Sequence, residues 1–142
     1  MQEKKDRVIL DTNLWISFLL TKDYAKLDSI LTDKGVVILF NQELLDEFIE
    51  VARRPKFKRY FSLKDLSELM HQISSHAEFI IVTSEIKVCR DPKDDFLLSL
   101  AIDGKATHLI TGDKDLLDLQ KFETTAIVTI TAYLSGQVST NR

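Results

Sequence analysis

The chain has 142 residues, a length that suits one compact domain and leaves little room for a second. Hydrophobic residues make up 44% and charged residues 29%, a balance that can fill one core and excludes a mainly disordered chain. The formal net charge of -3 argues against a protein that coats nucleic acid by charge alone, but it allows an enzyme that contacts a few phosphates.

The compartment is indicated by the cysteine content and by the apolar runs. Cys89 is the only cysteine, so neither an internal disulfide nor a zinc knuckle is available. The start of the chain lacks the apolar stretch of a signal peptide, and the longest apolar run, residues 14–20, is too short to span a bilayer. We therefore expect a single domain over residues 1–142, located in the reducing cytoplasm and not in a membrane.

Short aliphatic or β-branched runs alternate with longer helical patterns along the chain. The expected strands lie at residues 7–10, 36–40, 79–82, 108–110 and 126–130. The expected helices lie at roughly residues 13–33, 42–54, 63–76, 94–103 and 114–119. Continuous apolar runs are typical of strands buried on both faces, and intervening helices indicate parallel crossovers. The sequence therefore predicts a three-layer α/β/α fold around a central, mostly parallel sheet of about five strands.

Aspartates stand where two of these strands end and where one helix begins. Asp11 directly follows the first strand, Asp113 follows the fourth, and Asp94 opens the helix over 94–103. The carboxyl ends of parallel strands share one edge of a sheet, so these acids could converge there. Carboxylate oxygens are ligands that Mg²⁺ and Mn²⁺ favour. Aspartate is equally a preferred helix N-cap, so capping is the alternative for each of them.

Helix geometry distinguishes the two neighbouring aspartates at the start of helix 94–103. Asp94 shares its face with three apolar residues, Leu97, Leu98 and Ala101. Asp95 belongs to the only polar stripe of the helix, together with Ser99 and Asp103. We expect Asp94 to point toward the packed side and Asp95 toward water. A carboxylate on an apolar face is costly unless it is paired, hydrogen-bonded or bound to metal, so function and capping are about equally favoured for Asp94.

Glu47 lies at the border of the apolar arc of helix 42–54 and is the acid of that helix nearest to the core side. It is either a site residue or a boundary glutamate paired with Arg54 or Lys58.

Four segments, taken together, resemble the PIN domain family. They are VILDTN at 8–13, LLDEFIEVARRPKF at 44–57, CRDPKDDFLLSLA at 89–101 and LITGDKDLL at 109–117. Each segment alone is common, but the four occur in the order and approximate spacing of the family and span nearly the whole chain. The closest resemblance is to the prokaryotic branch described as toxins of toxin–antitoxin pairs.

This resemblance implies a PIN-type endoribonuclease that cleaves RNA phosphodiester bonds with Mg²⁺ or Mn²⁺. Carried over by position, the catalytic and metal-binding acids are Asp11, Glu47, Asp94 and Asp113. The auxiliary residues are Asp115, Asn13 and Thr111. Asp115 could instead cap the following helix, and the other two could merely satisfy turn backbone. The family also implies an antitoxin protein and a second copy of the chain as partners. The three histidines, His71, His76 and His108, are interpreted as structural or surface residues.

A basic run interleaved with aromatic residues follows the second motif. We predict that its cations contact RNA: Arg53, Arg54, Lys56 and Lys58. The alternative is that the cations form a solvated rim and that the aromatic residues, Phe57, Tyr60 and Phe61, are core or partner contacts. Trp15 and Phe18 form an apolar stripe for which core packing is the first interpretation and a dimer surface the second.

Two other functions compete with the nuclease. One is a non-catalytic RNA- or protein-binding module on the same scaffold. The other is a Mg²⁺-dependent phosphotransfer domain with Asp11 as nucleophile. Haloacid-dehalogenase-like phosphatases require a second aspartate two residues later, where this chain has Asn13.

Overall fold

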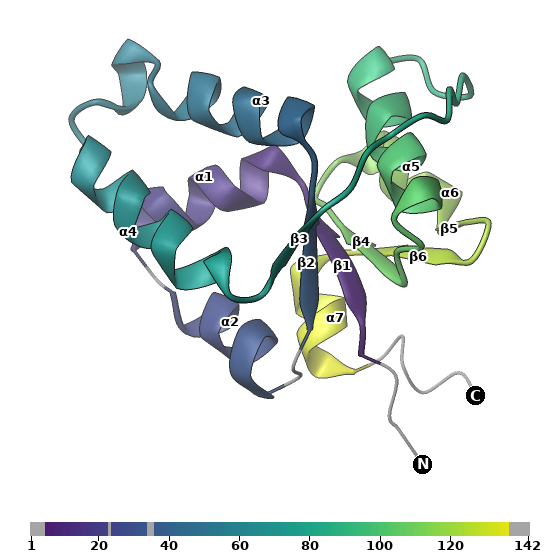
Figure 1. The fold of residues 1–142 in the computed structure, drawn as a ribbon, viewed down its shortest axis with the longest axis horizontal. Coiled ribbons are helices and arrows are strands. Elements are labelled where there is room, and N and C mark those ends of the chain that lie inside the picture. The colour runs from purple at the N-terminus through teal and green to yellow at the C-terminus, as the bar shows by residue number, and fades with distance from the viewer. Residues whose placement is uncertain (1–4, 23, 34–35, 137–142) are drawn as a thin grey trace.

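A central sheet lies between two layers of helices in the computed structural model, which describes residues 5–22, 24–33 and 36–136 (Figure 1). The sheet has six strands in the order β3-β2-β1-β4-β6-β5. Their bounds are β1 Arg7–Leu10, β2 Val37–Phe40, β3 Ala77–Phe79, β4 His108–Ile110, β5 Lys121–Phe122 and β6 Thr125–Val128. Only the short β5 pairs antiparallel, so the predicted mostly parallel α/β architecture is confirmed.

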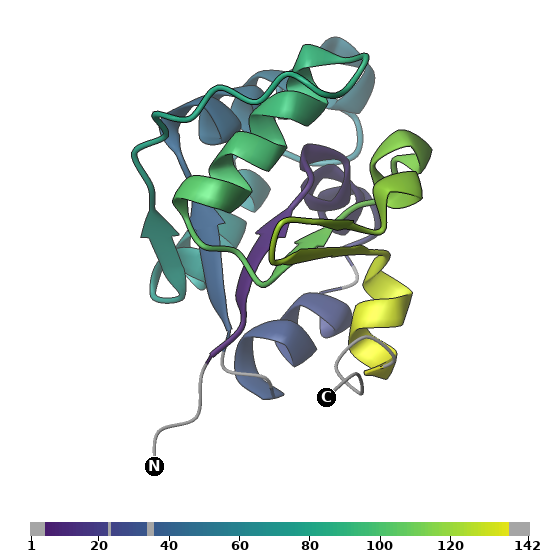
Figure 2. The ribbon, with the colours of Figure 1, turned by 90° about the vertical axis from the view of Figure 1, so that its right-hand side faces the viewer.

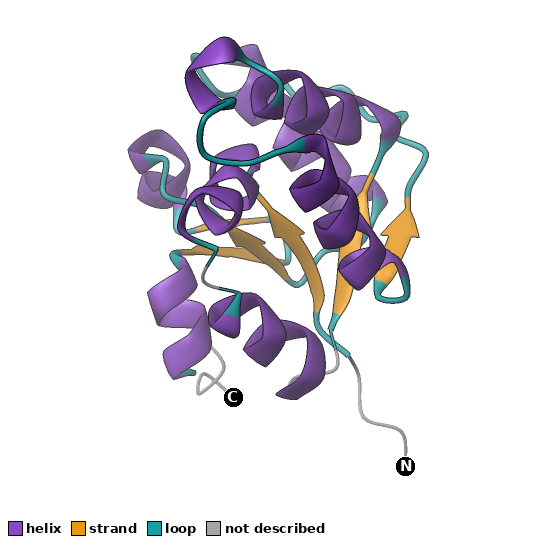
Figure 3. Ribbon diagram, turned by 90° about the vertical axis from the view of Figure 1, so that its left-hand side faces the viewer, coloured by secondary structure: helices purple, strands orange, loops and turns teal. Residues whose placement is uncertain are grey.

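The helices divide between the two faces of the sheet. They are α1 Thr12–Thr21, α2 Ala25–Asp28, α3 Gln42–Ala52, α4 Leu63–Ser74, α5 Pro92–Asp103, α6 Lys114–Leu119 and α7 Ile130–Ser135. A π-helical turn, Ser29–Asp33, and a 3-10 turn, Pro55–Phe57, complete the set. Figure 3 shows the α1–α4 side of the sheet, and Figure 2 shows α5 crossing the opposite face. Among the described residues, no helix is long and apolar enough to cross a bilayer.

The core forms where the central strands meet α1 and α3. Val8, Ile9 and Leu10 of β1 are fully buried, as a strand covered by helices on both faces requires. Trp15 of α1 stacks on Phe40 at the end of β2, with their ring centroids 5.5 Å apart. Trp15 and its neighbour Phe18 are both buried, so core packing was the right interpretation of that stripe.

The structure corrects the predicted element bounds in three places. The helix expected over 13–33 breaks after Thr21, because Lys22 adopts a left-handed backbone (φ 54°) and its N–H caps α1. The strand expected at 79–82 is instead β3, which ends at Phe79. Ile130, expected at the end of the last strand, is the first residue of α7, which Thr129 caps.

An extended segment between β3 and α5, residues 83–89, lies along α5, and we call it the strap. The polar stripe of α5 accepts its backbone N–H groups: Asp103 from Thr83 and Ser84, Ser99 from Ile86, and Asp95 from Val88 and Cys89. Asp95 lies on the outer side of α5 and stays partly exposed, as expected, but its carboxylate also binds the strap. Its hydrogen bonds to backbone N–H groups, Cys89 first, lower the pKa of Asp95. The stripe is polar because it holds the strap.

Candidate active site

A pocket of about 300 Å³ opens beyond the carboxyl ends of β1 and β4. Five acidic residues line it: Asp11, Glu47, Asp91, Asp94 and Asp113. Three cations line it as well: Arg54, Lys56 and Lys93. The structure thus brings the four predicted acids together from four separate elements. Parallel strand ends supply two of them, and the first turn of α5 and the middle of α3 supply the others.

Asp11 and Asp113 are positioned by one threonine. Asp11 caps α1 by accepting a hydrogen bond from the backbone N–H of Asn13 (3.2 Å). Its other carboxylate oxygen accepts a hydrogen bond from the Thr111 hydroxyl at 2.7 Å. The same hydroxyl accepts the backbone N–H of Asp113 at 3.0 Å. Capping and site geometry are therefore compatible for Asp11, and Thr111 does more than satisfy a turn.

Glu47 is half-buried on α3 and faces the pocket. Its Oε1 accepts a hydrogen bond from the Thr12 hydroxyl at 2.8 Å, and its Oε2 lies 3.4 Å from Lys93 Nζ. The alternative pairing with Arg54 or Lys58 is not formed. Arg54 instead pairs with Glu50, one turn away on the same helix.

Asp94 is the buried acid of the site, with a relative exposure of 6%. It does not cap α5, because Asp91 is the N-cap and accepts the Lys93 backbone N–H at 2.9 Å. Burial, followed by the charge and hydrogen bonding of Asp113 and the charges of Asp91 and Asp11, raises the pKa of Asp94 to about 7. A carboxyl group in these surroundings is stabilised in its charged form by a bound cation.

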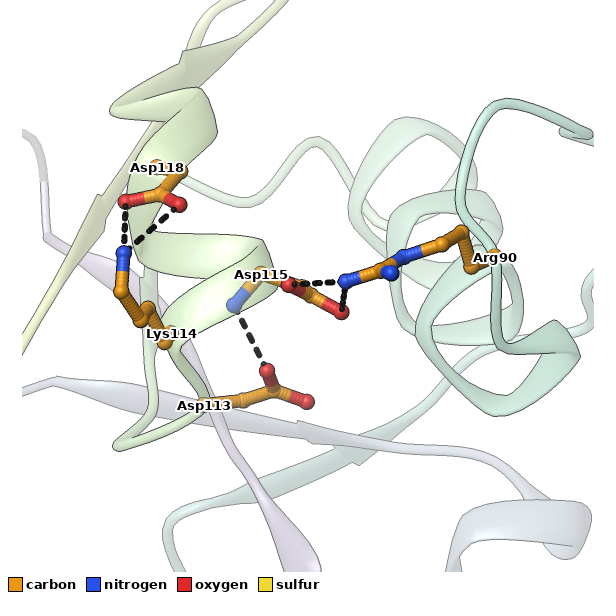
Figure 4. Close-up of polar contacts among 5 residues, drawn as sticks. All are labelled: Arg90, Asp113, Lys114, Asp115 and Asp118. Atoms are coloured by element: carbon orange, nitrogen blue, oxygen red, sulfur yellow. Dashed lines mark hydrogen bonds and ion pairs between the residues drawn. The ribbon is translucent and has the colours of Figure 1, made fainter.

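Asp115 lies close to Asp94 and Asp113, and its carboxylate pairs with Arg90. Its two carboxylate oxygens lie 3.0 and 3.1 Å from one guanidinium nitrogen of Arg90, the residue that follows the strap (Figure 4). The capping alternative for Asp115 is wrong, because Asp113 caps α6 and accepts the Asp115 backbone N–H at 2.8 Å. Oxygens of Asp94, Asp113 and Asp115 all lie within 4.8 Å of one another.

The carboxylates suit a divalent cation that prefers oxygen. None of the three histidines lines the pocket, and neither does Cys89. Burial, then hydrogen bonding to Asp95 and the negative charges nearby, raises the pKa of the Cys89 thiol to about 11, which keeps it uncharged. An all-oxygen donor set is typical of Mg²⁺ or Mn²⁺ rather than zinc.

The cations predicted to contact RNA separate into two groups. Arg54 and Lys56 line the acidic pocket. Arg53 and Lys58 line a different pocket, floored by buried Phe61 on the α4 side. Phe61 is therefore core, whereas Tyr60 keeps 52% of its surface exposed. The basic run does not form one continuous surface at the acidic pocket.

The sequence analysis did not assign three polar residues of the pocket to the site. Thr12, Asp91 and Lys93 each bind or flank one of the acids. Thr12 lies inside the DTN motif, and the other two lie in the DPKDD segment, so the motifs contain them. Their roles depend on contacts between α1, α3 and α5 that are distant in sequence.

The fold and the pocket define an α/β protein with a carboxylate centre at the carboxyl edge of a parallel sheet. The PIN domain family model matches residues 7–115, most of the chain, and the chain belongs to this family, whose members are generally nucleases. The chain is also similar to an uncharacterised protein of Methanocaldococcus jannaschii, with 28% identity over 123 residues. That alignment covers 84% of this chain and 79% of the relative.

Proposed function

We propose that this protein is a metal-dependent endoribonuclease that cleaves RNA phosphodiester bonds with Mg²⁺ or Mn²⁺. The observation that carries the proposal is the meeting of Asp11, Glu47, Asp94 and Asp113 in one pocket. Asp11, Asp94 and Asp113 would hold the ion, and Glu47 would complete the shell directly or through water. Asp115 lies near enough to contribute once Arg90 releases one of its oxygens.

The surrounding residues prepare the acids for this task. A bound divalent ion would lower the pKa of a bound water and neutralise charge that develops on the phosphate. Thr111 orients Asp11, and Thr12 orients Glu47, so these carboxylates are held before an ion arrives. Arg54 and Lys56 on the pocket wall offer positive charge to the phosphate backbone.

RNA as the substrate and the toxin role follow from the resemblance to the toxin branch of the family. On this basis we propose an antitoxin protein and a second copy of the chain as partners. We also propose that the protein acts in the cytoplasm. A small gene next to this one that encodes an antitoxin-like protein would support the toxin role.

The direct test is cleavage of a mixed RNA pool with Mg²⁺, with Mn²⁺ and with EDTA. Asp94→Asn and Asp113→Asn should abolish cleavage and leave the far-UV circular dichroism unchanged. The matched control is Asp118→Asn, which changes an exposed acid of α6 that pairs with Lys114 outside the pocket. If either site variant kept wild-type, metal-dependent activity, the proposed site would be wrong.

The same assay separates the competing functions. RNA binding without cleavage would favour a non-catalytic module on the PIN scaffold. A trapped aspartyl-phosphate would favour the phosphotransfer domain. The residues fit that reaction poorly, because Asn13 stands where such phosphatases require a second aspartate.

A further inference from the structure

Lys93 is the one pocket cation that contacts a site acid within the described part of the chain. Its Nζ lies 3.4 Å from Glu47 Oε2, and its side chain is 70% exposed. The other two cations of the pocket are engaged elsewhere: Arg54 with Glu50, and Lys56 over the ring of Phe57 at 5.1 Å. Lys93 is therefore paired with an acid of the site, whereas Arg54 and Lys56 are not.

The two oxygens of Glu47 are held unequally. The oxygen bound by Thr12 faces a buried hydroxyl from α1, at 2.8 Å. The oxygen bound by Lys93 faces a long, largely exposed side chain. An ion pair with so exposed a lysine contributes little to stability, so it exchanges readily for another partner. A lysine ammonium on a flexible stem can then donate to a different anion in reach.

The position of Lys93 indicates which anion could replace Glu47 as its partner. Lys93 directly precedes Asp94 in the first turn of α5, and both line the same pocket. If Glu47 Oε2 contacted a divalent cation, directly or through water, Lys93 would lose its partner at the edge of the acidic centre. The ligand that brings negative charge to that place is the phosphate of the substrate.

We propose that Lys93, beside the site acids, binds a phosphate group of the substrate in this pocket. It holds Glu47 while the pocket is free, and it donates to a non-bridging phosphate oxygen of the RNA once Glu47 is released. This inference rests on the proposed nuclease function and names the residue that receives the substrate's charge. In this proposal Lys93 binds the phosphate, and the acids remain the metal ligands.

The test is a double-mutant cycle on RNA binding in EDTA, where no metal-dependent turnover occurs. A labelled single-stranded RNA is titrated against wild type, Glu47→Gln, Lys93→Gln and the double variant over a series of salt concentrations. Glu47→Gln should free Lys93 and tighten binding, and most of that gain should vanish in the double variant. The slope of log affinity against log salt should be smaller by about 0.7 in the double variant than in Glu47→Gln, the loss of one phosphate contact.

Lys114 provides a matched control for charge alone. It directly follows Asp113 as Lys93 directly precedes Asp94, its side chain is 85% exposed, and it binds Asp118 at 3.2 Å (Figure 4). Lys114→Gln in the Glu47→Gln background should leave the salt slope unchanged. An equal loss of slope for both lysines, or equal gains with and without Lys93, would overturn the assignment of Lys93.

Kinetics with the metal-loaded enzyme give a second, independent measurement. Lys93→Gln should raise KM for RNA more than it lowers kcat, and Lys93→Arg should restore most of the loss. A wild type that neither binds nor cleaves RNA would refute the proposed function and this inference together. A wild type that cleaves RNA, with binding indifferent to Lys93, would refute this inference alone.

Discussion

The Thr111 hydroxyl donates a hydrogen bond to Asp11 Oδ2 at 2.7 Å and thereby joins the carboxyl ends of β4 and β1. Thr111 is 1% exposed, and its oxygen also accepts the Asp113 backbone N–H at 3.0 Å. One buried hydroxyl therefore sets the relative positions of two site acids. The pocket depends on this hydroxyl as well as on the carboxylates.

Replacement of Thr111 by valine tests this dependence. The substitution keeps the side-chain shape but removes the donor to Asp11 and the acceptor for Asp113. We expect affinity for Mn²⁺, measured by calorimetry, to fall by about 10- to 100-fold, as is typical when a residue that orients a metal ligand is lost. Thr111→Ser should retain most of the affinity. Thr125→Val, which removes a buried hydroxyl bound to the Ala106 carbonyl, is the control and should leave metal affinity unchanged.

The raised pKa of Asp94 predicts how the stability of the metal-free protein depends on pH. Its pKa is about 7 in the fold and 3.8 as an unperturbed group. Between these values the native state holds a proton that the unfolded chain releases, so this group's contribution to stability falls as pH rises through the window. Asp94→Asn removes the contribution. In urea unfolding with EDTA, wild type should lose more stability between pH 5 and pH 8 than the variant does.

Asp95 is the control for this pH dependence. Its pKa is lowered by backbone hydrogen bonds, so its stabilising contribution is already present above its usual pKa and is lost only in acid. Asp95→Asn should therefore keep the wild-type loss of stability between pH 5 and pH 8. Identical pH profiles for wild type and Asp94→Asn would contradict the buried, charged surroundings described for Asp94.

Asp115 and Asp113 should differ in how strongly they bind metal. Arg90 lies against both oxygens of Asp115, whereas Asp113 lines the pocket directly. We expect Asp113→Asn to remove Mn²⁺ binding in calorimetry and Asp115→Asn to weaken it by a smaller factor. Arg90→Gln should strengthen binding if the guanidinium competes with the ion for Asp115. If both aspartate variants lost the same Mn²⁺ affinity, Asp115 would be as strong a metal ligand as Asp113.

The central strands could be predicted from sequence because their apolar runs are continuous. β1 and β4 have the predicted bounds, and each consists of residues that helices cover on both faces. The run at 79–82 has the same composition but a different outcome. β3 ends at Phe79, and Ile81 is 87% exposed. Hydrogen-bond acceptors on α5, later in the chain, draw the following segment away from the sheet, and no local pattern contains that information.

The sequence predicted which acids belong to the site better than it predicted which residues contact them. The helical face placed Asp94 on the packed side, and it is buried there. The same reasoning offered Arg54 or Lys58 as partners of Glu47 if it were not a site residue, whereas its contacts are Thr12 and Lys93. Helix periodicity describes neighbours on one helix, and these contacts form only when α1, α3 and α5 converge. Asp91 was missed because a cap and a site acid look alike in sequence.

The strap provides a prediction about the stability of the protein. Asp103 accepts the Ser84 hydroxyl and the backbone N–H groups of Thr83 at 2.6 Å and Ser84 at 2.9 Å. These hydrogen bonds, that of the Ser84 side chain first, lower the pKa of Asp103. Asp103→Ala leaves both N–H groups to water, so we expect a loss of about 1–2 kcal/mol, a value reduced by the partial exposure of the site. Amide hydrogen exchange at Thr83 and Ser84 should accelerate in this variant while exchange in β1 reflects only the global loss.

Glu85 supplies the comparison within the same segment. Its side chain is exposed on the strap, so Glu85→Ala should change the free energy of unfolding by no more than about 0.5 kcal/mol. If Asp103→Ala were as stable as Glu85→Ala, the polar stripe would not be what holds the strap on α5. Because Arg90 directly follows the strap and binds Asp115, Asp103→Ala should also loosen that ion pair. Metal affinity should then shift slightly in the same direction as in Arg90→Gln, which calorimetry on both variants would show.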